Sequence, residues 1–170
     1  MVKNIDVALT LINESIKRGQ NDPDYYMDYI KLHKLMYLGQ CLVRNKYGFD
    51  LFGEQVLASE TGPYIEGLDV ITAACGFEEI RTNEGLKKYT PVLIPILRKE
   101  CCDLILDVFG KYNTEEIVKF TKNTYAYRNS YIKNQNNIIH KELMTITGEE
   151  LFGKDEYKIR KLILNKTNKR

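Results

Sequence analysis

The stretch from Lys31 to Glu66 decides the fold of this chain. It opens with Lys31-Leu-His-Lys-Leu-Met-Tyr37, continues through Asp50-Leu-Phe-Gly-Glu-Gln-Val-Leu-Ala58 and ends with Gly62-Pro63-Tyr-Ile-Glu66. The first segment carries apolar residues at helical spacing, whereas the second favours an extended strand. Proline suits the first turn of a helix, because the donor it lacks would be unpaired there. We therefore predict a helix, a short strand and a second helix that begins at residues 61–63 and runs to about Ala74.

Amphipathic helices are predicted on both sides of this stretch. The helix over residues 26–47 has apolar residues on more than one face, so we expect it to lie at the centre of the fold. Residues 113–116, Asn-Thr-Glu-Glu, have the order of a capping box and predict a helix start. A small hairpin is expected over residues 77–90, because two short runs flank a turn-forming sequence. Further helices are predicted over residues 7–19, 94–108 and 155–164.

These elements predict a mainly α protein, a compact helical domain with a small β-hairpin or short sheet. The length of 170 residues and the 44% hydrophobic content suit one domain that buries about 70% of the surface exposed by its unfolded chain. We expect that domain to span residues 1–153. Residues 154–170 are expected to form a C-terminal basic helix and tail, packed on the domain or extending from it.

The sequence favours a cytoplasmic protein that does not enter a membrane. No apolar run approaches the roughly 18 to 20 residues that a span requires, and the first 18 residues lack the apolar core of a signal peptide. Cys101 and Cys102 are adjacent, Cys41 and Cys75 stand alone in apolar contexts, and no Cys-x-x-Cys spacing occurs. We therefore expect reduced cysteines, mostly in the core. The oligomeric state is left open.

The charge of the chain is unevenly distributed. Residues 154–170 hold seven Lys or Arg and two acids, so with a net charge of +2 overall the preceding 153 residues carry −3. A protein that grips DNA through many phosphate contacts needs a basic face. Here only the tail supplies one. It is either a packed last helix or a contact for nucleic acid or an acidic partner.

No combination of residues predicts catalysis, and we expect no enzyme activity, cofactor or metal site. The two histidines, His33 and His140, lie more than a hundred residues apart, and no cysteine spacing supports zinc binding. The glycine-rich loops that cradle phosphates are absent from the sequence. A lone histidine in a helix is usually packed or solvated, although a hydrolase built around His33 remains a third hypothesis.

Tyrosine is frequent, with twelve residues and no tryptophan. Tyrosines cluster at residues 25–29 and 125–131, and the second cluster also contains Arg128. Tyrosine combines apolar area with a polar tip and is enriched at binding surfaces. These clusters therefore line a partner-binding face or form the edge of the core. Stacking on single-stranded nucleic acid is a weaker interpretation of the second cluster.

The quoted stretch resembles the Panacea domain family. The resemblance rests on Lys31-Leu-x-Lys-Leu-x-Tyr37, on the Leu-Phe pair at 51–52 and on Gly62-Pro63, and it extends through most of residues 5–132. In the second half, Val108-Phe-Gly-Lys-Tyr112, Thr114-Glu-Glu-Ile117, Thr121-Lys122 and Tyr127-Arg128 look like the later helices of the family. The chain departs from the family at three positions. His33 stands where Gln is frequent, Lys122 where His is frequent and Tyr127 where Trp is frequent.

This resemblance implies a prophage-associated, mostly helical antitoxin that binds and neutralises a protein toxin. Neutralisation would occur by direct occlusion or by delivery of the toxin to a protease. The resemblance further implies that a group of residues lies at or near one partner-binding surface, whereas Gly62 and Pro63 are structural. The expected binding residues are Lys31, His33, Lys34, Tyr37, Thr121, Tyr127 and Arg128. The alternative is a phage-encoded inhibitor or regulator of a host protein or nucleic-acid complex, with the basic tail as its handle.

Overall fold

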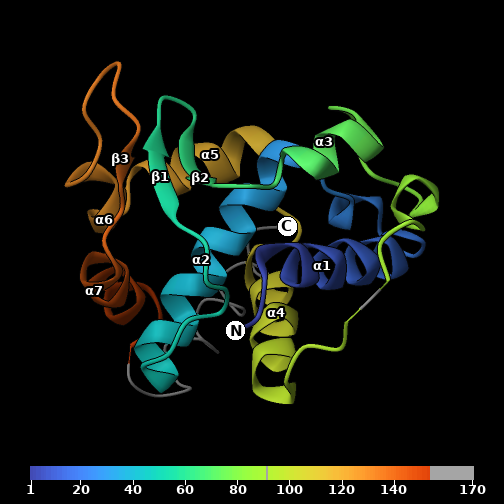
Figure 1. The fold of residues 1–170 in the computed structure, drawn as a ribbon, viewed down its shortest axis with the longest axis horizontal. Coiled ribbons are helices and arrows are strands. Elements are labelled where there is room, and N and C mark those ends of the chain that lie inside the picture. Colours follow the sequence, from blue (N-terminus) through green and yellow to red (C-terminus); the bar gives the residue numbers. More distant parts are fainter. Residues whose placement is uncertain (91, 154–170) are drawn as a thin grey trace.

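The computed structural model describes residues 1–90 and 92–153, and these residues form a mainly α fold with a small antiparallel sheet (Figure 1). The predicted fold class is therefore confirmed. The predicted helix over 155–164 lies outside the described residues. The helices are α1 (Asn4–Gly19), α2 (Tyr29–Tyr47), α3 (Asp69–Cys75), α4 (Ile96–Phe109), α5 (Thr114–Lys122), α6 (Tyr125–Arg128) and α7 (Lys141–Phe152), with 3-10 turns at Pro23–Tyr25 and Glu84–Leu86.

Helix α2 lies at the centre of the fold, as predicted. It packs against α1, α4, α5, α7 and strand β2, and Figure 1 shows it between α1 and α4 on one side and the sheet and α7 on the other. Every residue from Lys31 to Val43 is buried. The Asp28 side chain caps its N-terminus by accepting from the Lys31 N–H, and Gly48 ends it in the left-handed conformation with φ +72°.

The sheet corrects the prediction for Gly62 and Pro63. Strands β1 (Val56–Ser59), β2 (Gly62–Ile65) and β3 (Asn137–Ile138) are arranged in the order β2-β1-β3. Gly62 and Pro63 therefore lie in a strand, paired with Ser59 and Ala58, and not at a helix start. Gly62 has φ +105°, which a helix excludes. Proline is tolerated because β2 is an edge strand.

The expected hairpin over residues 77–90 is also wrong. Ile80 instead forms a bridge with Met27, and its N–H donates to the Met27 carbonyl over 2.8 Å. This contact holds the segment against the start of α2, and residues 84–86 form a 3-10 turn that takes up the end of the expected turn and the first residue of the expected second strand, 86–90. Local turn signals were therefore outweighed by a hydrogen bond between residues 53 positions apart.

The start of α5 confirms the capping box. The Asn113 side chain accepts from the Glu116 N–H over 2.8 Å, and the Glu116 carboxylate accepts from the Asn113 N–H over 3.1 Å. Each side chain thus satisfies a backbone donor that the helix leaves unpaired. The motif fixes where α5 begins after the turn that follows α4.

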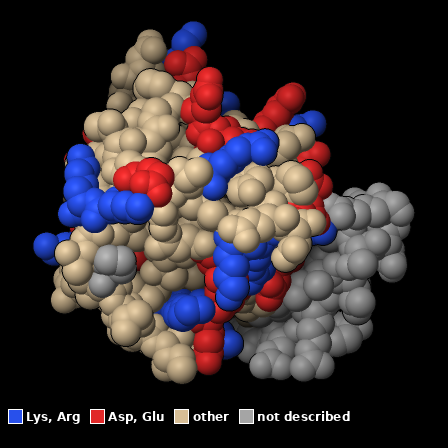
Figure 2. All heavy atoms as spheres, turned by 90° about the vertical axis from the view of Figure 1, so that its right-hand side faces the viewer, with Lys and Arg blue, Asp and Glu red and all other residues tan. Residues whose placement is uncertain are grey.

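The surface carries charges of both signs in close alternation on the face that Figure 2 displays. Lysine and arginine side chains lie beside aspartate and glutamate, and uncharged surface lies between these mixed groups. No helix in residues 1–90 and 92–153 has the length and apolar character needed to cross a bilayer.

The close approach of α7 to α2 gives a first prediction. A side chain at Gly148 would overlap the Cys41 carbonyl oxygen, because the two helices meet there without an intervening Cβ. We expect Gly148→Ala to lower the free energy of unfolding by about 1–3 kcal/mol, measured by urea denaturation. Ile146→Ala on the partly exposed face of α7 is the control and should cost less. Equal losses would show that helix packing at Gly148 is not tight.

Candidate functional site

Polar side chains of α2 form a buried centre in the molecule. Lys31, His33 and Lys34 have exposed fractions of 2%, 1% and 1%, and Tyr37 is fully buried. Buried charged groups require partners, because desolvation is costly. Each of these side chains has at least one hydrogen-bond partner outside its own helix.

Lys31 joins two connecting segments to α2. Its Nζ donates to the carbonyl oxygens of Asp24 over 3.1 Å, Tyr26 over 3.2 Å and Gly110 over 2.6 Å. The first two carbonyls belong to the connection between α1 and α2, and Gly110 follows the end of α4. Burial lowers the pKa of Lys31 to about 8, so the amine remains mainly protonated at pH 7 and can donate all three hydrogen bonds.

Lys34 holds the β-hairpin. Its Nζ donates to the Pro63 carbonyl over 3.0 Å, and its Cε lies 3.0 Å from the position that a Cβ on Gly62 would occupy. Burial lowers the pKa of Lys34 to about 8. The absence of a side chain at residue 62 thus lets the lysine pass beside the strand. Gly62 and Pro63 thus contact Lys34 inside the fold, and their expected structural role stays a prediction.

His33 lies between two aromatic rings. Its Nδ1 accepts from the Ile65 N–H over 2.8 Å, its ring stacks on Tyr64 at 4.3 Å, and it meets the edge of Tyr29 at 4.5 Å. Accepting at Nδ1 places the proton of the neutral ring on Nε2, which is buried and has no hydrogen-bond partner in the described structure. Burial, aided by the positive charge of Lys34, lowers the pKa of His33 to about 3.

The predicted residues farther along the chain also turn inward. The Tyr37 hydroxyl is 2.7 Å from Thr124 Oγ1, and Thr121 donates to the Ile117 carbonyl over 2.8 Å. Burial raises the pKa of Tyr37 well above its usual range, so this hydroxyl stays protonated. The first contact joins α2 to the start of α6, and the second lies within α5.

Tyr127 and Arg128 have different environments. The Tyr127 side chain is 3% exposed, stacks on Tyr131 at 5.3 Å, and donates to the Ser59 carbonyl over 2.7 Å. Burial raises the pKa of Tyr127 to about 12. Arg128, in contrast, is exposed. Adjacent residues in the helical turn α6 thus face the interior and the solvent respectively.

The structure corrects the expectation that seven residues share a surface. Six of them are buried, since their polar atoms satisfy backbone groups and neighbouring hydroxyls inside the fold, and only Arg128 is exposed among the seven. The buried six are Lys31, His33, Lys34, Tyr37, Thr121 and Tyr127. Their role in binding a partner stays a prediction. In this conformation the six side chains are not accessible to a partner, and they affect binding only by positioning the helices and strands that they hold.

Two groups of polar residues were missed. Gln40 accepts from the Leu51 N–H over 2.7 Å and donates to the Phe52 carbonyl over 3.3 Å. Its position seven residues after His33, on the same face of α2, was the signal that could have identified it. The second group is Tyr64 and Asp69, which meet Tyr29 of the first tyrosine cluster. The three residues come from three separate elements, so their meeting has no signal in local sequence.

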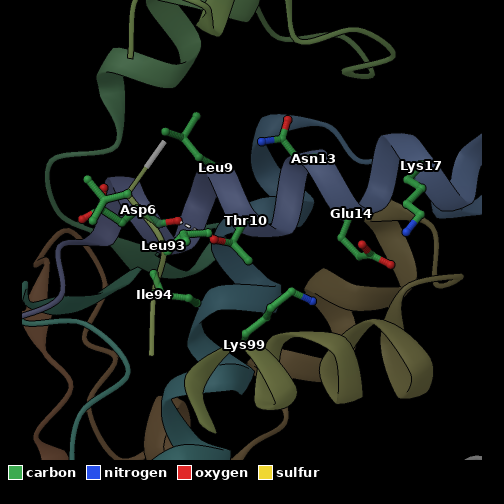
Figure 3. A pocket seen from close by; sticks show the side chains of 10 residues that line it. Asp6, Leu9, Thr10, Asn13, Glu14, Lys17, Leu93, Ile94 and Lys99 are labelled. Atoms are coloured by element: carbon green, nitrogen blue, oxygen red, sulfur yellow. Dashed lines mark hydrogen bonds between the residues drawn. The ribbon is translucent and has the colours of Figure 1, made fainter. Parts of the chain in front are cut away.

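A groove of about 310 Å³ lies between α1 and the segment that leads into α4 (Figure 3). Figure 3 shows Leu9 and Thr10 of α1 on one side, with Leu93 and Ile94 beside them. Its charged residues are of both signs. They are Asp6, Glu14, Lys17 and Lys99. The groove is therefore mixed in charge and apolar at one wall, a combination that suits contact with another protein better than binding of a highly charged ligand.

The described residues bring together no group of three or more His, Cys, Asp or Glu side chains that could hold a metal ion. The cysteine thiols Cys41, Cys101 and Cys102 are buried, and burial raises the pKa of each. These thiols are thus kept protonated and poorly nucleophilic. The amines of Lys31 and Lys34 donate to backbone carbonyls, which makes them structural donors.

Comparisons with protein-family models, curated proteins and solved structures found no match to this chain. The geometry of the described residues, together with the sequence resemblance, therefore has to support any functional proposal.

The three carbonyl contacts of Lys31 give a second prediction. Lys31→Met leaves three carbonyl oxygens, one of them in a fully buried hydrogen bond, without this donor, and we expect the free energy of unfolding to fall by roughly 3 kcal/mol in chemical denaturation. Lys34→Met is the matched control, since it removes a buried ammonium that contacts one carbonyl, and its loss should be smaller. A loss in Lys34→Met as large as that in Lys31→Met would contradict this account of Lys31.

The environment of His33 predicts acid sensitivity. Because the pKa is about 3 in the folded state and 6.5 for the ordinary group, the unfolded chain binds a proton between these values and the folded protein does not. The free energy of unfolding should therefore decrease as the pH falls from 6.5 towards 3, by up to about 1.4 kcal/mol per pH unit from this group. In His33→Gln this contribution should disappear, as measured by urea denaturation across that pH range.

The other histidine supplies the control for this measurement. His140 is exposed, and His140→Gln should keep the pH dependence of the parent protein. If His33→Gln and the parent protein lose stability equally steeply below pH 6.5, other groups cause the acid sensitivity.

Proposed function

We propose that this protein is a non-enzymatic, antitoxin-like protein that binds and neutralises a protein toxin. The resemblance of residues 31–66 to the Panacea domain family supports the class of function. The buried polar groups of α2 form hydrogen bonds that hold the backbone in place. Because these groups are therefore not presented to a substrate, they support a binding role. A prophage origin and action in the cytoplasm are parts of the same proposal.

An exposed apolar segment at residues 92–97 carries this proposal in the structure. Leu93 is 95% exposed and Ile96 is 72% exposed, and both border or adjoin the groove along α1. Val92 and Leu97 are also exposed large hydrophobic residues. Ile94, between them, is buried. Exposed large apolar side chains grouped in one segment favour protein contact, because covering them removes them from water.

Direct occlusion is the form of neutralisation that the surface favours. The groove has walls on two elements, so a partner segment can be contacted by α1 and by residues 92–97 at the same time. Mixed charges at its border can set the orientation of the partner, while the apolar wall supplies affinity. Delivery of the toxin to a protease is compatible with the same surface, since it also begins with binding.

The alternative of a nucleic-acid regulator receives less support. On the face that Figure 2 displays, acidic and basic side chains alternate, whereas binding to a phosphate backbone needs a basic stripe. The basic residues 154–170 lie outside the described part of the chain. An inhibitor of a host protein would use the same apolar segment and remains the second candidate.

The apolar segment gives a fourth prediction. The double variant Leu93→Asp with Ile96→Asp should lose rescue of host growth and co-purification when it is co-expressed with the product of the adjacent reading frame. Charge placed on an apolar contact surface must be desolvated on binding, which should weaken binding by at least about tenfold. The wild-type protein should rescue growth and form a stable complex.

The control places the same charges on another exposed apolar surface. Ile132→Asp with Ile146→Asp changes residues that are 53% and 41% exposed, away from the groove. It should retain rescue and complex formation. Rescue by the Leu93 and Ile96 variant would remove this surface from the proposal, and a neighbouring product that is harmless and does not bind would favour a host-directed inhibitor.

A further inference from the structure

A second surface combines two tyrosines with one carboxylate. The Tyr64 hydroxyl donates to Asp69 Oδ1 over 2.6 Å, and the Tyr29 hydroxyl reaches the same oxygen over 3.2 Å. The two hydroxyl oxygens are 3.1 Å apart. Burial, together with the hydrogen bond to Asp69, raises the pKa of Tyr64, so the phenol remains a donor. Three elements, α2, β2 and α3, thus orient one carboxylate.

The interior holds this cluster in a fixed geometry. The His33 ring stacks on Tyr64 and meets the edge of Tyr29, and its Nδ1 is held by the backbone of β2. Both tyrosine rings are therefore fixed on the side of the core, while Asp69 is exposed. Preorganisation of this kind lowers the entropy lost when a ligand binds.

One exposed apolar side chain contacts the cluster, and two more follow cluster residues in the sequence. Phe77 is 78% exposed, and its ring meets the Tyr29 ring edge-on at 6.5 Å. Ile30 and Val70, next in sequence to Tyr29 and Asp69, are each 40% exposed. A single carboxylate among exposed aromatic and aliphatic groups suits a ligand that is cationic at its tip and aliphatic along its stem.

Two further carboxylates lie close in the sequence to residues of the cluster. Glu66 and Glu78 are exposed, as is Asp69. No ion pair among the described residues includes Asp69, and the structure gives no hydrogen-bond partner to its Oδ2. The nearby Lys34 ammonium is buried and donates to the Pro63 carbonyl. The carboxylate is thus presented to solvent without a cationic partner.

We propose that Tyr29, Tyr64, Asp69 and Phe77 form a site for an arginine side chain of a protein partner. The guanidinium donates to Asp69 Oδ2 and packs against the exposed Phe77 ring, and its aliphatic stem contacts the exposed apolar side chains. Arginine fits better than lysine because its planar guanidinium can donate to a carboxylate and stack on an aromatic ring at the same time. The site is separate from the groove at residues 92–97 and does not depend on the antitoxin proposal.

The test is an NMR titration of the full chain with N-acetyl-arginine amide. Backbone amide signals at Asp69, Tyr64 and Phe77 should shift and saturate. N-acetyl-citrulline amide, which has nearly the same shape without the charge, should bind about tenfold more weakly. Asp69→Asn should weaken arginine binding by a similar factor, whereas Glu66→Gln, which removes a neighbouring negative charge, should change it less than twofold.

Two further measurements test the contact with the Phe77 ring and the class of ligand. Phe77→Ala changes a largely exposed side chain, so the fold should persist, and binding should weaken about threefold if the ring contacts the guanidinium. The peptide acetyl-Ala-Leu-Arg-Leu-Ala-amide should bind at least about threefold more tightly than N-acetyl-arginine amide, because its leucines reach the apolar rim.

Several results would overturn the assignment. Equal binding of the arginine and citrulline probes, or equal effects of the Asp69 and Glu66 variants, would show that no specific carboxylate site exists. If the Asp69→Asn protein does not fold, the Phe77→Ala variant tests the site in its place. Unchanged arginine binding by Phe77→Ala would then reject the site. No gain for the peptide would mean that the site takes a free guanidinium compound and not a protein partner.

Discussion

The buried ammonium of Lys31 is the interaction on which the rest of the structure depends. It satisfies three carbonyls, from the connection between α1 and α2 and from the end of α4. Irregular backbone inside a protein needs donors, because water is absent there. One lysine therefore allows two connecting segments to pack beside the centre of the fold. A hydrophobic residue of similar size could fill the space but could not supply the donors.

Hydrogen bonds from buried side chains to the backbone also explain the sequence pattern of residues 31–66. His33, Lys34 and Gln40 lie along α2, and each forms hydrogen bonds with the backbone of residues 51–65. The Lys-Leu-x-Lys-Leu helix and the Gly-Pro strand are thus two parts of one contact. Their spacing in the sequence reflects the geometry of a helix that carries a hairpin on its polar side chains. This packing fixes Tyr64 in the place where it meets Asp69.

Periodicity and capping predicted α1, α2, α4 and α5, because both are local properties. The central position of α2 could be inferred from apolar residues on several faces, and the Asn113 motif marked the start of α5. Gly62-Pro63 was misassigned because the pair suits a helix start and an edge strand equally well. What decides between them is the positive φ of Gly62 and the passage of Lys34 beside it, and neither is visible in local sequence.

The burial of the polar residues could not be predicted for a related reason. Lysines in a helix are normally solvated, and the Gly110 carbonyl that holds Lys31 lies 79 positions away. This separation has a consequence for the order of events during synthesis. Until Gly110 has been made, the nascent chain lacks one of the three acceptors of Lys31, so α2 cannot complete its polar contacts. The central helix of the protein therefore reaches its final environment only after most of the elements around it have been translated.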